Sequence, residues 1–200
     1  MEDLKKTALR MVQIREGVRA NSPRSTELAR SVVEEEPTAA ILAQLAWEFI
    51  EDVLAEAAPS YKLPPPASES ELVALRVALV SRFSHEPPKM LAALLARHDG
   101  ILRGDAGTAF FSVEQILNAA AWLEDVDPTL LPISADLAGN CAVMRLSGPA
   151  EDFGQVYGFW HEDFADRGLE PLAGSIGEYL MLARHQIIET ITDMYHGPML

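Results

Sequence analysis

Cysteine is almost absent from this sequence. The 200 residues include a single cysteine, Cys141, which cannot form an internal disulfide and therefore fits a reducing compartment. No apolar run approaches the roughly 18 residues that a membrane-spanning helix needs. The N-terminal stretch, residues 1–17, is charged throughout and lacks the apolar centre of a signal peptide. We therefore expect a cytoplasmic protein that does not insert into a membrane.

Basic residues are also scarce. Lys and Arg number 16 against 30 Asp and Glu, which gives a formal net charge of −14. Most of the excess lies in residues 61–200, with nine Lys and Arg against nineteen Asp and Glu. A surface this acidic repels nucleic acid and anionic lipid, so we expect neither as a direct partner. It favours association with a basic protein, although acidity also serves simply to keep proteins soluble.

Sequence motifs of common catalytic and cofactor sites are missing. The chain has no G-x-S-x-G, no P-loop, no G-x-G-x-x-G and no C-x-x-C. Two short segments carry side chains suited to acid/base catalysis or metal binding, namely His98 with Asp99 and the run 161–163. A single segment, however, rarely supplies all the ligands of a metal site. We therefore predict no catalytic, cofactor-binding or metal-binding residues. The less favoured alternative is a small hydrolase or metal protein that uses His98, Asp99, Asp136 or His161.

The pattern that is present is mainly helical. Apolar spacing predicts helices over 25–36, 38–58, 68–83, 86–100, 112–123 and 175–195, with Thr38 as the N-cap of the second. Three of them start with a Ser that is followed three residues later by Glu or Gln, the spacing of a capping box. Short apolar runs predict strands over 108–111, 130–134, 141–147 and 155–160. This order predicts an α+β fold, with a largely antiparallel sheet flanked by helices and an N-terminal helical extension.

The best internal boundary is a proline-rich segment. Residues 58–71 contain four prolines, so this segment cannot continue a helix and tends to stay extended. It is either a linker between domains or a strap laid across one domain. We divide the chain here into a helical extension, residues 1–58, and an α+β domain, residues 59–200.

A polar break interrupts the apolar stretch 131–146 and carries Asp136, Gly139 and Asn140. An aspartate that starts a turn accepts the N–H two residues on, and glycine supplies the positive φ that other residues resist. We therefore predict a strand-to-strand turn rather than a catalytic or metal-binding loop. For the same reasons, His98 and Asp99 are predicted to end a helix, with Gly100 as its left-handed C-cap.

In their order along the chain, these segments resemble the SUKH superfamily. That group includes the SMI/KNR-like fungal cell-wall assembly regulators and many bacterial immunity proteins. The resemblance lies between residues 63 and 185 and is carried by "LPPPASESELVALRVAL", "PPKMLAALLARHDGI", "FFSVEQIL", "LPISADLAGN", "VYGFW" and "LAGSIGEYL". The family's turn residues are matched by His98, Gly100, Asp136, Gly139 and Asn140, whereas Asp99 stands where members often have asparagine. Residues 1–58 are outside the resemblance.

The resemblance implies a protein-binding domain without catalysis or cofactor. For bacterial members it implies an immunity protein that neutralises a toxin domain, and the acidic charge of this chain suits a basic toxin. The expected partner surface comprises acidic and aromatic residues, namely Asp99, Asp105, Trp160, His161, Glu162, Asp163 and Asp166. The alternative is an adaptor or scaffold that forms a homo-oligomer through residues 1–58.

Overall fold

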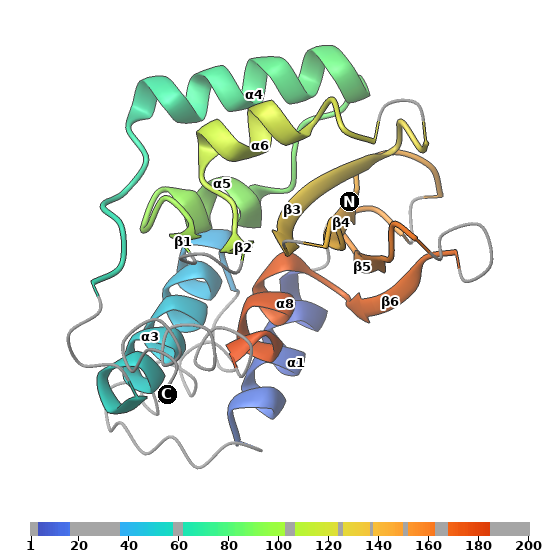
Figure 1. The fold of residues 1–200 in the computed structure, drawn as a ribbon. Coiled ribbons are helices and arrows are strands. Elements are labelled where there is room, and N and C mark those ends of the chain that lie inside the picture. Colours follow the sequence, from blue (N-terminus) through green and yellow to red (C-terminus); the bar gives the residue numbers. More distant parts are fainter. Residues whose placement is uncertain are drawn as a thin grey trace, which may run out of the picture.

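The computed structural model describes residues 4–16, 37–57, 62–102, 107–123, 126–136, 138–149, 152–162 and 168–184. In this part of the chain, six helices accompany a six-stranded sheet (Figure 1). The helices are α1 (Leu4–Glu16), α3 (Ala39–Ala57), α4 (Glu69–Phe83), α5 (Lys89–Leu95), α6 (Val113–Ala119) and α8 (Ile176–Leu182). The strands are β1 (Ile101–Leu102), β2 (Gly107–Phe110), β3 (Leu130–Asp136), β4 (Cys141–Arg145), β5 (Val156–Phe159) and β6 (Glu170–Ala173). The predicted α+β class, with its N-terminal helices, is confirmed.

The sheet is a simple antiparallel meander. Its strands follow one another in the order β1-β2-β3-β4-β5-β6, and every neighbouring pair is antiparallel. Chain direction therefore alternates, and successive connections leave the sheet at alternate ends. Asp136, Asn140 and Trp160 lie at one end, which we call the turn end, while Gly100 and Phe111 lie at the other.

One hydrophobic core joins all six helices to one face of the sheet. Met11 of α1, Leu42 of α3, Leu91 of α5 and Leu180 of α8 are fully buried in the same cluster as Met144 of β4. The described helices of residues 1–58 therefore pack on the α+β part instead of standing apart from it. Figure 1 shows α1 lying alongside α8, in agreement with the contacts between these helices.

The opposite face of the sheet carries a second, smaller cluster. Leu130, Val143, Tyr157 and Phe159 are buried there together with Cys141. Alternation along β5 places Tyr157 and Phe159 on this face, while Val156 of the same strand joins the main core, as expected for a period of two. Strands β3, β4 and β5 are thus buried on both faces, which explains their nearly continuous apolar sequences.

The helix starts follow from local sequence. The Ser68 hydroxyl accepts from the N–H of Glu71 while the Glu71 carboxylate accepts from the N–H of Ser68, and Ser112 and Gln115 make the same pair of bonds at α6. At α3, the Thr38 hydroxyl accepts from the N–H of Ile41 at 3.3 Å. These side chains satisfy N–H groups that the first helical turn leaves without a partner. The predicted N-caps are therefore confirmed.

Several predicted boundaries are wrong. The helix predicted over 86–100 ends at Leu95, because the carbonyl of Leu95 accepts from the N–H of Ala67 and the N–H of Asp99 donates to the carbonyl of Pro65 instead of continuing the helix. Gly100 is therefore not a helix C-cap, and it lies in the turn before β1. The helix predicted over 112–123 ends at Ala119, and β1 and β6 were not predicted. The helix predicted over 25–36 and the end of the last helix beyond residue 184 lie outside the described residues.

Residues 62–67 of the proline-rich segment form a packed strap, and α4 begins directly after them. The N–H of Ala67 donates to the carbonyl of Leu95, and the carbonyl of Pro65 accepts from the N–H of Asp99, both at 3.0 Å. The carbonyl of Pro64 lies 2.8 Å from Nδ1 of His98. Because the segment bonds at three points to the end of α5 and to the turn that follows it, these residues act as a strap and not as a free linker.

Candidate functional site

His98 connects three parts of the fold. Its Nδ1 donates to the carbonyl of Pro64 at 2.8 Å, and its Nε2 lies 3.1 Å from Oε1 of Glu51 on α3. Its ring meets Trp47 edge-on, with centroids 4.9 Å apart. The same Glu51 oxygen lies 3.6 Å from Nη2 of Arg97. Both ring nitrogens therefore face acceptors that belong to the protein itself, and the side chain ties the strap to α3.

Asp99 supports the start of α6. Its Oδ1 accepts from the N–H of Val113 at 2.8 Å, in the first turn of that helix. Burial raises the pKa of this carboxyl, the bond from Val113 lowers it, and the nearby carboxylates of Glu71 and Glu114 raise it further. Asp99, Glu71 and Glu114 thus form an acidic group at the N-terminal ends of α4 and α6.

The backbone conformation at residue 100 requires glycine. Its φ is +86°, in the region that side chains disfavour. A Cβ at this position would lie 2.7 Å from the carbonyl oxygen of Phe110 and 2.7 Å from the nitrogen of Ser112. Both neighbours are main-chain atoms that cannot rotate away. The His98–Gly100 motif therefore joins α5, the strap, β1 and α6 in one fixed turn.

The break at Asp136 is the predicted strand-to-strand turn, and that prediction is confirmed by the pairing of β3 with β4. Oδ1 of Asp136 accepts from the N–H groups of Ala138 and Asn140, both at 2.9 Å. Oδ2 accepts from Nδ2 of Asn140 at 2.9 Å. Gly139 has a φ of +84°, and the ring of His161 lies against it. Both carboxylate oxygens of Asp136 are therefore engaged in holding the turn.

The residues expected to form a partner surface do not all lie together. His161 and Glu162 are exposed at the turn end, and the Trp160 indole donates to Oε2 of Glu170 at 3.1 Å. The Trp160 ring packs over Gly158, where a Cβ would lie 3.4 Å from its Nε1. Asp99 lies at the opposite end of the sheet and is partly buried. The remaining three residues, Asp105, Asp163 and Asp166, lie outside the described residues.

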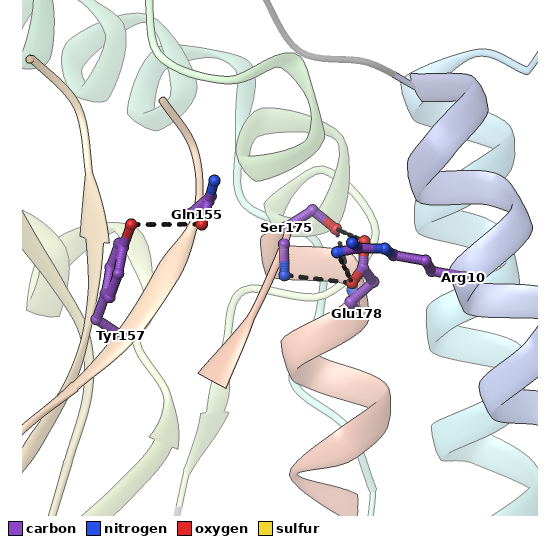
Figure 2. A network of polar contacts seen from close by, with 6 residues as sticks. Arg10, Gln155, Tyr157, Ser175 and Glu178 are labelled. Atoms are coloured by element: carbon purple, nitrogen blue, oxygen red, sulfur yellow. Dashed lines mark hydrogen bonds and ion pairs between the residues drawn. The ribbon is translucent and has the colours of Figure 1, made fainter. Parts of the chain in front are cut away.

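A polar network joins α1 to α8, and no pattern in the sequence predicts it (Figure 2). The Glu178 carboxylate is buried and accepts from the N–H of Gly174 and from the hydroxyl of Ser175. Nη1 of Arg10 on α1 lies 3.5 Å from Oε2 of Glu178 and forms an ion pair with it. The spacing of Ser175 and Glu178 identifies the helix start, but no sequence signal links Arg10 to a residue 168 positions away. This network attaches the N-terminal helix to the last described helix.

The single cysteine of the sequence, Cys141, carries a buried thiol. Burial raises the pKa of the Cys141 thiol to about 11, and Asp136 adds to the shift, so the thiol stays protonated at neutral pH. Among the same residues, no group of three or more His, Cys, Asp or Glu side chains is arranged to hold a metal ion. No helix in the described ranges is both long and apolar enough to cross a membrane.

The candidate residues therefore fall into two separate groups. His98, Asp99 and Gly100 fix the strap and the start of α6, while Asp136, Gly139 and Asn140 fix the turn end. Their polar atoms are bonded mainly to the backbone of the protein.

Compared with known proteins, the sequence matches no protein-family model and no curated protein.

Proposed function

We propose that this chain is a non-catalytic protein-binding domain of the SUKH type, which binds and neutralises a basic toxin domain as an immunity protein. The observation that carries the proposal is how the motif residues are used. His98 has both ring nitrogens bonded within the fold, and Asp136 has both carboxylate oxygens bonded within its own turn. Side chains used in this way stabilise a surface and leave few free groups to act on a substrate.

The charge of the molecule supports the same function. Exposed carboxylates occur at both ends of the sheet, with Glu69 and Glu114 at one end and Glu162 and Glu170 at the turn end. Toxin domains that cleave nucleic acids need basic surfaces to bind phosphate groups. An acidic inhibitor complements such a surface and is steered towards it, so association becomes fast at low salt.

The self-associating adaptor is the weaker candidate. It requires the N-terminal helices to offer apolar surface to a second copy. Met11 of α1 and Leu45 and Phe49 of α3 are instead fully buried in the core of the same molecule. In the described helices α1 and α3, most of the large apolar side chains are therefore used within the same molecule, with Leu9 exposed, and this favours the toxin-binding proposal over the alternative.

A pull-down from lysate of the source organism tests the proposal. The tagged full-length protein is presented at low and at moderate salt, with an unrelated protein of similar net charge as the control bait. We expect a basic protein that is retained at moderate salt by this bait alone and whose toxic activity is inhibited by one equivalent of the chain. Recovery of the bait alone, or of the same proteins on both baits, would contradict the immunity function.

A further inference from the structure

The outer face of α4 carries two exposed valines, Val73 and Val77, which pack into neither hydrophobic cluster of the described residues. This helix packs inward through Leu75, Leu79 and Phe83, while Val73 and Val77 on its other side are 55% and 63% exposed. Residues four apart lie on one face of a helix, so Glu69, Val73 and Val77 form a single row that we call the α4 stripe. Figure 1 shows α4 at the periphery of the molecule, next to α6.

The surroundings of the α4 stripe are acidic. Glu69 heads the stripe itself, and Glu71 and Glu114 lie at the same end, close enough for both to act on the Asp99 carboxyl. The exposed cation beside the stripe is already paired, because Arg76 donates two hydrogen bonds to Glu86 at 2.6 and 2.8 Å. Among the described residues, the stripe therefore combines two exposed valines with the carboxylates of Glu69, Glu71 and Glu114, while Arg76 is occupied by Glu86.

We propose that the α4 stripe is the docking site for an amphipathic, positively charged segment of the partner protein. The valines supply apolar contact, and the acidic end of the stripe attracts Lys or Arg side chains that flank apolar residues in the partner. A second copy of this chain is disfavoured as the occupant because each copy carries a net charge of −14. The inference rests on the protein-binding function proposed above and specifies where that binding occurs.

A defined peptide tests the docking site without the natural partner. The probe is a helical Leu/Lys peptide with one apolar face, titrated into the isotope-labelled full-length protein at physiological salt and followed by NMR. A scrambled peptide of the same composition, which lacks the apolar face, measures attraction by charge alone. The double variant Val73→Ser, Val77→Ser removes the apolar part of the stripe. Its matched control is Leu9→Ser, Leu172→Ser, which alters two exposed leucines on other elements.

We expect the amphipathic peptide to perturb amides of α4 and the first turn of α6, and the scrambled peptide to do so weakly. The valine variant should bind the peptide about tenfold more weakly, or about 1.4 kcal/mol, while the leucine control should stay within about twofold of wild type. Equal weakening in both variants, or perturbations centred elsewhere, would overturn the α4 stripe as the docking site. If the peptide does map to α4 but the pull-down retains no basic protein, the immunity function fails and the surface stands.

Discussion

Replacement of Gly100 by alanine tests the idea that the His98–Gly100 motif is structural. The new Cβ would meet two backbone atoms at 2.7 Å, and the residue would keep a φ of +86°. Positive φ costs an alanine about 1–2 kcal/mol, and overpacking adds about 1–3 kcal/mol. The smaller entropy of the unfolded alanine chain offsets about 0.4–1 kcal/mol. We therefore expect Gly100→Ala to lower the free energy of unfolding by about 2–4 kcal/mol.

Gly168→Ala is the matched control for this experiment. Gly168 also has a positive φ, +65°, but no atom of the described residues lies within 4 Å of the position that a Cβ would take. Its cost should therefore be limited to backbone strain, about 1 kcal/mol. Urea unfolding followed by circular dichroism separates the two, because a slope of about 2 kcal/mol per molar converts the Gly100 effect into a midpoint drop of about 1–2 M. Equal midpoints for the two variants would refute the steric argument.

Three further predictions concern single polar residues. Asp136→Ala removes the acceptor of three hydrogen bonds and should lower the free energy of unfolding by about 2 kcal/mol. Thermal unfolding measures this loss, and an unchanged melting temperature would contradict the role of Asp136 in the turn. Burial and neighbouring carboxylates raise the pKa of Asp99, so the folded state holds this proton more tightly than the unfolded state. The stability of wild type should therefore fall, relative to Asp99→Asn, as the pH rises through the raised pKa, and parallel stability curves for the two proteins would disprove this. Finally, burial raises the pKa of the Cys141 thiol to about 11, which leaves little of the reactive thiolate near pH 8. Alkylation of Cys141 in the native protein at this pH should therefore be at least about a hundredfold slower than in the unfolded protein. Similar alkylation rates in the two states would contradict the burial of this thiol.

Structural features that depend only on residues close together in the sequence could be predicted from it. The capping boxes at Ser68 and Ser112 and the turn at Asp136 involve partners within four positions, so their spacing alone identifies them. Strand β6 lacks such a signal, because its residues are largely exposed and it is a strand only through pairing with β5. The early end of α5 likewise depends on the strap, which bonds to the chain at Asp99.

The sequence identifies the residues of the candidate site but does not predict which residues of other elements they contact. The sequence identifies His98 and Asp99 as a unit, but their partners, Glu51 on α3 and Val113 on α6, become neighbours only through the packing of helices. The α4 stripe shows the reverse situation. Its valines match the apolar spacing of an ordinary helix, and only the packing of the folded chain separates the buried leucines from the exposed Val73 and Val77.

The use of polar motif residues to hold the backbone suits a protein whose function is to bind. Ordering a loop or a helix end at the moment of association subtracts from the affinity, so a surface that is already fixed binds more tightly for the same contacts. Here the N-terminal ends of α4 and α6 are fixed by capping boxes, and Asp99 bonds directly to the first turn of α6. These ends carry the acidic group beside the α4 stripe. The motif that resembles the SUKH pattern therefore stabilises the same part of the molecule that we propose contacts the partner.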